Sequence, residues 1–534
     1  MASVTSLTVS IPSTSTSTSN LKQQQQLLQP KSRWFSIEFF IYYLVFVCSL
    51  IKMVSTTLSL SQEQHRNYPF YKHKLSPGWI FDRKIDISDS QYRRFRLGLG
   101  QLTALAFGYL LIARLVGRHS RNRIKFQTCA AALILLALHG TSVFKILIII
   151  TANYHLARRA PSPLIWVFNV GVLFANDYWD GYRYRHFLPL LSFLVRKYRG
   201  LIPRWQIGFN ISMLRLISYS FDYQWAAAAK AKQTTNSPRE LSEYGFINYF
   251  NYVFYPPLYI AGPIITFNNF TSQIARSPST ITPRMIIGYS IRFLICFLTM
   301  EFVLHYMYVI AIKDARAWGG DSPFELSMIG YWNLIAVWLK LLIPWRFFRL
   351  WALLDGVDAP ENMVRCMANN YSTLAFWRSW HRSYNLWIVR YIYLPLGGSN
   401  NVVPSTILVF TFVALWHDLS LRLLWWGWLV SVFVIPEVLA KKVFSGSIHE
   451  KKWYFRHLSA IGGTLNVLSM MSANLVGFAI GLDGVKVMWS QILGSCYLSG
   501  FLTLLTTVGA LFCAVQMMME YREEERREGI WRKC

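Results

Sequence analysis

Acidic side chains are scarce in this chain. Only 26 of the 534 residues are Asp or Glu, against 54 Lys and Arg, and charged residues together make up 15%. A soluble domain carries about 25% charged residues, so this composition excludes an ordinary soluble globular protein. In a soluble protein the net charge of +28 would indicate nucleic acid. No nucleic-acid partner is predicted here, because the basic residues fall mainly between apolar segments, where they set membrane topology or bind an anionic group.

The chain also lacks any cysteine spacing that would hold a metal. None of its seven cysteines belongs to a CxxC pair, and they are scattered over the whole sequence: Cys48, Cys129, Cys296, Cys366, Cys496, Cys513 and Cys534. We therefore predict no metal site and no disulfide framework. There is no internal repeat either, which argues against a transporter built from inverted repeats.

Apolar and aromatic residues are abundant instead. The chain is 53% hydrophobic and holds 21 Trp, a residue that gathers at membrane–water interfaces. A helix needs about 20 apolar residues to cross the hydrocarbon region of a bilayer. About eleven segments approach this, near 34–54, 97–116, 127–151, 162–178, 246–267, 285–312, 326–345, 402–416, 421–439, 461–480 and 494–519. The sequence thus predicts an all-α polytopic membrane protein with about eleven transmembrane spans.

Composition divides the chain into four expected regions. Residues 1–33 are rich in Ser, Thr and Gln and are predicted to be a disordered tail. Residues 34–95 hold a first span and a polar link, 96–520 form the transmembrane core, and 521–534 form a charged C-terminal tail. Within the core, the broken apolar patches of 179–225 predict re-entrant or interfacial helices.

His417 ends the apolar run 406–416. A charged side chain at the centre of a membrane helix costs about 2.5–3.5 kcal/mol on insertion scales, so ionisable residues there indicate function. Histidine is also the side chain best suited to move a proton near neutral pH. The alternative is a structural histidine that is held by hydrogen bonds.

A polar stretch precedes this histidine. Read as one helix, it places Arg378, His381 and Asn385 along one stripe. A deep histidine could deprotonate a hydroxyl that attacks an acyl thioester, and His381 or Asn385 could donate hydrogen bonds to the oxyanion. Arg378, Arg382 or Arg390 could hold the phosphates of the acyl carrier. Alternatively these basic residues contact lipid headgroups.

The order of several motifs identifies a family. The motifs lie at 204–225, 252–267 (with Pro256-Pro257 and Gly262-Pro263), 355–366, 376–399 and 415–418. Together they resemble the membrane-bound O-acyltransferase (MBOAT) family, in the branch of the yeast glycerol-uptake (Gup) proteins, which are related to hedgehog acyltransferase. The resemblance covers about residues 90–520 and implies an MBOAT-type helical core.

The resemblance also implies roles for single residues. His417 corresponds to the catalytic histidine of the family, and its neighbours Trp416 and Asp418 are expected at the substrate. His381 takes the place of a second polar residue of the family, whereas Asn385 is supported by helix geometry alone. Cys366 resembles the thiol with which hedgehog acyltransferase binds haem; acylation of the thiol and a plain buried cysteine are the other interpretations.

The reaction implied by the resemblance is transfer of a long-chain acyl group from acyl-CoA, with no further cofactor. The expected acceptor is a lyso-GPI lipid or a GPI-anchored protein, in a multi-pass protein of the endoplasmic reticulum membrane, with the plasma membrane as a second location. One alternative is a proton-coupled glycerol transporter in which Glu301, His305 and His417 relay the proton. The other is a protein acyltransferase of the hedgehog type.

Overall fold

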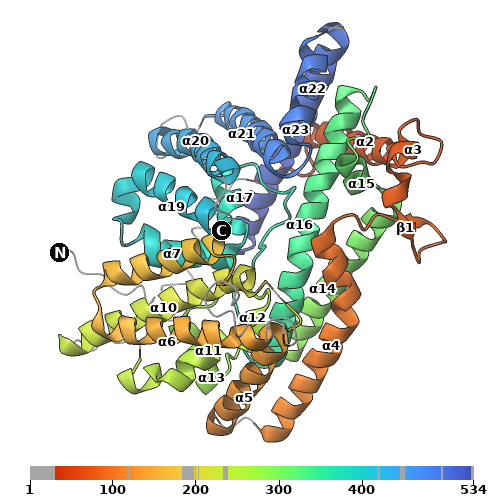
Figure 1. Cartoon of the computed structure of the whole chain (residues 1–534). Coiled ribbons are helices and arrows are strands. Elements are labelled where there is room, and N and C mark those ends of the chain that lie inside the picture. The colour runs from red at the N-terminus through yellow and green to blue at the C-terminus, as the bar shows by residue number, and fades with distance from the viewer. Residues whose placement is uncertain are drawn as a thin grey trace.

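The chain folds almost wholly into helices (Figure 1). This computed structural model describes residues 31–117, 120–182, 198, 200–202, 204–232, 239–417, 421–444, 452–494 and 497–530. The longer helices are α2 (Ile37–Leu60), α4 (Ser90–Val116), α5 (Ser120–His139), α6 (Val143–Arg159), α7 (Ser162–Tyr178), α10 (Trp205–Ala231), α14 (Pro283–Tyr306), α16 (Pro323–Leu354), α19 (Val402–His417), α20 (Leu421–Phe444), α21 (Phe455–Phe478), α22 (Gly481–Leu493) and α23 (Tyr497–Arg527). The shorter elements are α3 (Tyr68–Tyr71), β1 (Ser76–Pro77), β2 (Lys84–Ile85), α11 (Phe246–Val253), α12 (Pro256–Tyr259), α13 (Phe267–Ala275), α15 (Val309–Asp314), α17 (Thr373–Ser379) and α18 (Arg382–Ile388).

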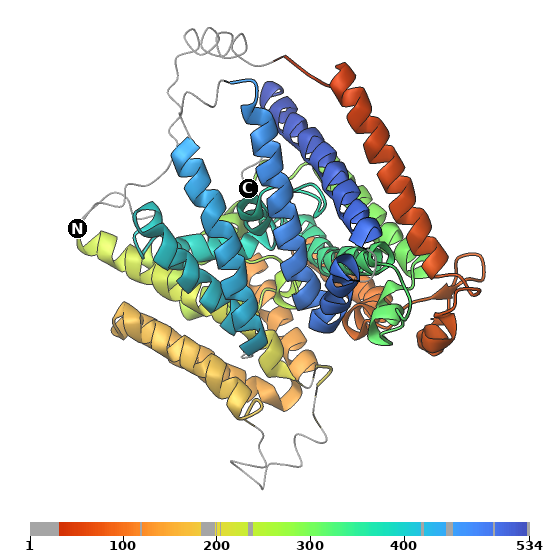
Figure 2. The same cartoon turned by 90° about the horizontal axis from the view of Figure 1, so that it is seen from above.

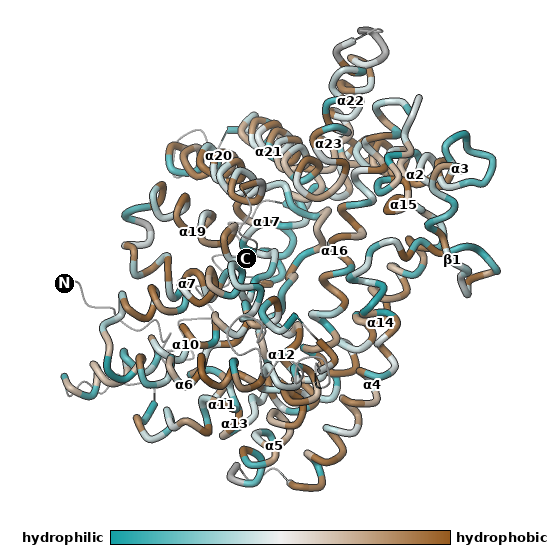
Figure 3. Tube along the Cα trace, in the orientation of Figure 1, coloured by the Kyte–Doolittle hydropathy of each residue, from teal (hydrophilic) through white to brown (hydrophobic). Residues whose placement is uncertain are grey.

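The predicted polytopic helical architecture is confirmed. Within the described residues, eight helical stretches are long and apolar enough to cross a membrane. They are 37–60, 90–116, 122–159, 283–306, 323–354, 423–444, 455–478 and 500–527. Figure 3 shows these helices as hydrophobic over most of their length, with hydrophilic residues gathered around α3 and β1 and near α17. The protein is therefore a multi-pass membrane protein.

The eight stretches are fewer than the eleven expected because some apolar segments are short or broken. At a rise of about 1.5 Å per residue, the 17 residues of α7 and the 16 of α19 fall short of a hydrocarbon core of about 30 Å. The segment 246–267 is divided by Pro256 and Pro257, which begin the four-residue α12. Proline lacks the backbone N–H that a continuing helix needs, so this segment bends back into the protein.

α16 is the central helix of the fold (Figure 1). It begins at a capping box in which Ser322 and Glu325 each bond the other's backbone, and Pro323 occupies its first position. In its most apolar stretch 61% of the residues are buried, against 11% in α2 and in α4. α16 thus forms the interior, while α2 and α4 face outward, and Figure 2 shows α2 on the flank opposite α6 and α7.

The segment around 205–222 differs from the interfacial helix expected from the sequence. It belongs to α10, a continuous helix of 27 residues of which fourteen are buried. Its Arg215 is 1% exposed and donates to the carbonyls of Val253 and Leu258, both at 2.6 Å. Those two carbonyls flank the Pro256–Pro257 break. The Arg215 guanidinium therefore stabilises a bend inside the protein and does not lie at the membrane interface. Residues 183–197 of the same predicted region lie outside the described residues.

The first and the last described segments of the chain contact each other. Of the predicted tail 1–33, only residues 31–33 are described, and the Arg33 backbone N–H donates to Glu520 Oε1 at 3.0 Å. The charged C-terminal segment from residue 521 continues α23 as a helix as far as Arg527. Arg365 forms an ion pair with Glu525 at 2.7 Å, so these last turns pack on the body of the protein.

Candidate active site

A cavity of about 1490 Å³ lies in the interior and holds both histidines that the sequence singled out. Its wall is formed by residues of α2, α4 and α16 to α23, with part of the segment between α16 and α17, and it is mostly apolar. His381 and His417 line it, although 35 residues separate them in the chain. The structure therefore brings the two histidines to one space large enough for lipid chains.

The segment with His381 is not the single helix predicted from the sequence. α17 ends at Ser379, α18 begins at Arg382, and His381 between them has φ 46° and ψ 48°, in the left-handed region. Asn362 holds this break, because its carbonyl accepts from the Arg382 N–H at 3.1 Å and its side chain accepts from the Ser383 N–H at 3.0 Å. The predicted stripe of Arg378, His381 and Asn385 is therefore wrong: a distant asparagine overrides the local helical pattern.

Aromatic rings fix the position of the His381 imidazole. The ring is stacked on Trp345, with centroids 4.7 Å apart and an angle of 19° between the planes. Tyr384 lies at 5.4 Å and Trp416 at 6.3 Å. Trp416 also contacts His417 at 4.8 Å, edge to face. Trp416 thus lies between the two histidines and holds both.

Trp416 itself is a packing residue more than a surface of the cavity. It is 6% exposed, and its indole N–H donates to the carbonyl of Asn210 at 3.0 Å. His417, the last described residue of α19, lines the cavity. Asp418, which the sequence placed at the substrate, lies outside the described residues.

The three arginines expected to hold carrier phosphates do not converge on the cavity. Arg378 is exposed on α17, and Arg382 is half-buried at the first position of α18. Arg390 forms an ion pair of 2.9 Å with the fully buried Asp222 and stacks on Trp225. None of the three is among the residues that line the cavity.

Asn385 and Cys366, by contrast, do line the cavity. The Cys366 side chain is exposed to it from the irregular segment between α16 and α17. A haem or an acyl chain on this thiol would occupy part of the cavity. Within the described residues there is also no cluster of three His, Cys, Asp or Glu side chains that could hold a metal ion.

Sequence reasoning missed three residues that shape the site: Trp345, Asn362 and Tyr384. The Tyr384 side chain lines the cavity next to His381, and its hydroxyl has no hydrogen-bond partner among the described residues. This hydroxyl is itself buried, so the contribution of Tyr384 to the site is its ring, which packs beside His381 and Trp416. The position of Tyr384 between His381 and Asn385 was the signal that the sequence offered for it. Trp345 and Asn362 gave no such signal, because they reach the site from remote segments of the chain.

Glu301 and His305, the other two residues of the transporter hypothesis, have partners away from His417. Glu301 accepts two hydrogen bonds from Arg96, at 2.7 and 2.8 Å, and one from the Trp79 indole at 2.7 Å. His305 contacts the carbonyl of Glu301 at 2.7 Å. Neither Glu301 nor His305 lines the cavity that holds His417. The proton relay required by the transporter hypothesis is therefore not assembled in this structure.

Comparison with known proteins agrees with the predicted family. The family model for MBOAT, the membrane-bound O-acyltransferase family, matches residues 125–479. Membrane-bound O-acyltransferase GUP1 of Saccharomyces cerevisiae is 44% identical over 94% of both chains, and the protein of that name from Candida tropicalis is 42% identical over 97% of this chain and 93% of its own. The protein-cysteine N-palmitoyltransferase HHAT of Mus musculus is more distant, 26% identical over 58% of this chain and 63% of its own. The chain belongs to the membrane-bound O-acyltransferase family, in its Gup branch, and is an acyltransferase.

Proposed function

We propose that this acyltransferase moves a long-chain acyl group from acyl-CoA to a hydroxyl of a lyso-GPI lipid, with His417 as the general base. The observation that carries the proposal is the placement of His417 and His381 on the wall of one large apolar cavity. In the reaction the acceptor oxygen attacks the thioester carbonyl while His417 takes the hydroxyl proton. The C–S bond then breaks, and the thiolate of coenzyme A leaves with that proton.

Stabilisation of the oxyanion would come from the break between α17 and α18. His381 and Asn385 both line the cavity, one turn apart at the start of α18. Each can present an N–H to the negative oxygen, and removal of one such donor typically costs 10²–10³-fold in rate.

The choice of acceptor rests on the names of the relatives and on the apolar cavity. The yeast relatives are named O-acyltransferases, and HHAT is named for palmitoyl transfer to a protein cysteine. A hydroxyl acceptor on a lipid fits the nearer relatives, and an apolar cavity fits a lipid chain. We place the reaction in the endoplasmic reticulum membrane, with GPI-anchored proteins as the acceptors in their lyso form.

The test is an assay of the purified protein in lipid nanodiscs with radiolabelled palmitoyl-CoA. Lyso-GPI, a peptide with an N-terminal cysteine, and buffer alone are offered as separate acceptors. We expect ester formation on lyso-GPI alone. Label on the peptide would favour the hedgehog type of acyl transfer. Proton-linked glycerol flux in liposomes without an acyl donor would favour the transporter.

His381 gives a prediction that separates its chemistry from its backbone. Asparagine tolerates the left-handed region and keeps an N–H donor, whereas a β-branched residue is strained there. We expect His381→Asn to fold normally with activity reduced about tenfold or less. We expect His381→Val to lose at least about 100-fold in rate and 1–2 kcal/mol in stability. Assays paired with thermal unfolding of both variants check this, and equal activities would remove His381 from the oxyanion site.

A further inference from the structure

The charged end of α23 contacts the protein on two opposite faces. The segment 520–527 is helical throughout. Residues three, four or seven positions apart share one side of a helix, so Glu520, Glu523 and Arg527 lie on one side and Arg522 and Glu525 on the other. Glu520 is 0% exposed and Glu525 is 5% exposed. Both sides of this segment therefore meet other parts of the protein.

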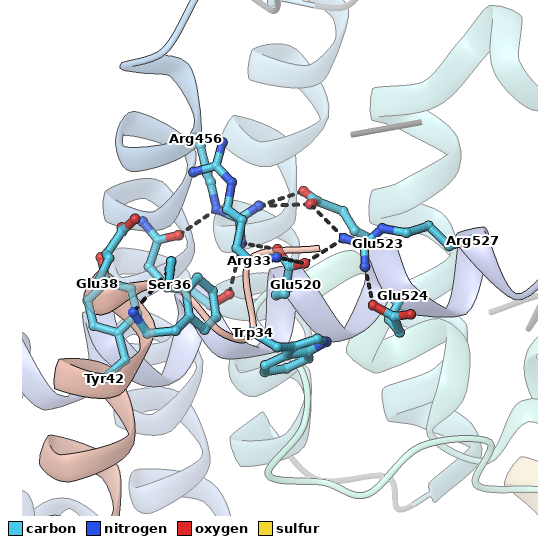
Figure 4. A network of polar contacts seen from close by, with 12 residues as sticks. Arg33, Trp34, Ser36, Glu38, Tyr42, Arg456, Glu520, Glu523, Glu524 and Arg527 are labelled. Carbon is cyan, nitrogen blue, oxygen red and sulfur yellow. Dashed lines mark hydrogen bonds and ion pairs between the residues drawn. The ribbon is translucent and has the colours of Figure 1, made fainter. Parts of the chain in front are cut away.

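The first side contacts α21 and the beginning of the described chain (Figure 4). Arg456 of α21 forms ion pairs with Glu523 at 2.8 Å and with Glu520 at 3.1 Å. The Arg33 N–H donates to the same Glu520 at 3.0 Å, and Arg527 pairs with it at 2.5 Å. None of these five residues lines the cavity. This side of the segment thus holds the end of α23 in place.

The second side contacts the linker between α16 and α17, residues 355–372. Arg365 of this linker donates two hydrogen bonds to Glu525, at 2.9 and 2.7 Å, and the two side chains are 9% and 6% exposed. Arg522 donates to the carbonyl of Asn369 at 2.5 Å. Two parallel bonds between a guanidinium and a carboxylate restrict orientation as well as distance. The end of α23 therefore fixes the linker at two places.

The same linker contains Asn362, which holds the backbone break at His381. Asn362 is fully buried and accepts from the N–H groups of Arg382 and Ser383, at 3.1 and 3.0 Å. Only two residues separate Asn362 from Arg365. An irregular segment has no regular ladder of its own hydrogen bonds, so its conformation depends on contacts with other elements. A displacement of Arg365 would thus move the acceptor that shapes the backbone at His381.

On the other side of Asn362, the linker is held by α16. Arg349 of α16 forms ion pairs with Asp358 at 2.7 Å and with Glu361 at 3.3 Å. All of these residues fall within the part of the chain that the family model matches, residues 125–479. Glu525 lies beyond that part. The contact with α23 is therefore a second support for Asn362 that comes from outside the matched region.

We propose that Glu525 is a positioning residue for acyl transfer: by holding Arg365 it fixes Asn362, and with it the left-handed backbone at His381. The inference rests on the proposed oxyanion role of His381 and adds that the segment 520–527 is needed to build that site. Glu525 does not line the cavity, so it acts through other residues. A group that is displaced by about 1 Å in an active site can cost about 100-fold in rate. Loss of Glu525 should therefore lower kcat and leave substrate binding intact.

The pair is tested with Glu525→Gln and with the double variant that also carries Arg365→Gln. The single variant leaves the buried Arg365 guanidinium without the Glu525 carboxylate, whereas the double variant removes both charges and allows a hydrogen bond between two amides. We expect Glu525→Gln to lower kcat about 10–100-fold, with the KM for palmitoyl-CoA within about threefold. We expect the double variant to recover to within about fivefold of the wild type. Equal losses in the two variants would overturn the pair as the cause.

A matched glutamate provides the control for the single variant. Glu528 is exposed, one turn after Glu525. We expect Glu528→Gln to keep the wild-type kcat. A loss as large as that of Glu525→Gln would mean that any change in charge at this end of the chain lowers activity, and the specific contact with Arg365 would be rejected.

Dependence on His381 separates positioning from general stability. His381→Gly removes the imidazole and tolerates the left-handed backbone. In that background we expect Glu525→Gln to change kcat less than about threefold, because the donor that it positions is gone. A further loss as large as in the wild-type background would show that Glu525 does not act through His381.

Hydrogen exchange separates this inference from the reaction itself. The N–H groups of Arg382 and Ser383 begin α18 and have no partner within that helix, so their protection reports the contact with Asn362. In lipid nanodiscs we expect faster exchange of these two N–H groups in Glu525→Gln than in the wild type, and restored protection in the double variant. That pattern, in a protein without turnover on lyso-GPI, would retain the positioning contact and reject the proposed function. Unchanged exchange in Glu525→Gln, with turnover intact in the wild type, would reject the positioning role alone.

Discussion

Replacement of His417 by alanine is expected to lower the rate of acyl transfer by about 10²–10⁴-fold, the usual contribution of a general base. His417 lines the cavity, and no other histidine of the described residues except His381 does so. His381 is stacked flat on Trp345 and is therefore poorly placed to swing into the same role. The loss should appear in kcat and leave the KM for both substrates within about threefold.

A matched histidine outside the cavity provides the control. His155 is exposed on α6 and contacts Tyr154. We expect His155→Ala to retain wild-type activity, and both variants to accumulate to the same level in the membrane with the same thermal stability. If His417→Ala retained more than about a tenth of the activity, the imidazole would be a structural group and not the base.

Removal of the Arg390 side chain is expected to destabilise the protein by about 3 kcal/mol. Asp222 is fully buried and accepts from Arg390 at 2.9 Å, from the Tyr391 hydroxyl at 3.0 Å and from the Asn268 N–H at 3.2 Å. Breaking a buried pair from one side costs about 3–5 kcal/mol because a charge is left unpaired. The lower end applies, since only Asp222 of the pair is fully buried, the Arg390 side chain is 41% exposed, and Asp222 keeps two of its donors. Thermal unfolding of Arg390→Ala in detergent measures the change.

Two further variants define the cause of that loss. Arg378→Ala removes an exposed arginine of the neighbouring α17 and should change stability by less than about 0.5 kcal/mol. Asp222→Asn combined with Arg390→Ala removes the buried charge and should recover part of the stability. An Arg390→Ala protein of unchanged stability with a raised KM for acyl-CoA would contradict this structural role. It would support the phosphate-binding role expected from the sequence.

The positions of Arg378, Arg382 and Arg390 could not be predicted from residue type and spacing. A guanidinium suits a phosphate and a buried carboxylate equally well, so residue type alone does not choose between them. Arg390 meets Asp222, which is 168 residues away in the chain. Periodicity could not predict that pair, nor the contact of Asn362 that interrupts the helix at His381.

The predicted residues that line the cavity were found by three different signals. His417 was singled out as a polar residue at the end of an apolar run, Asn385 by helix geometry, and Cys366 by resemblance to a family thiol, while His381 had both geometry and resemblance behind it. A polar group is costly in such surroundings unless it has a partner or a polar space. Local composition is sufficient to detect that cost, and this is why His417 could be predicted from its surroundings.

By itself, the sequence determined that the protein is helical and spans a membrane, because runs of apolar residues are stable only in lipid and only with their backbone bonds satisfied within helices. The order of its motifs also determined the family. Only the tertiary structure decided the backbone break at His381, the partner of Arg390, and the meeting of His381 and His417 at one cavity, because each depends on side chains that meet from distant parts of the chain.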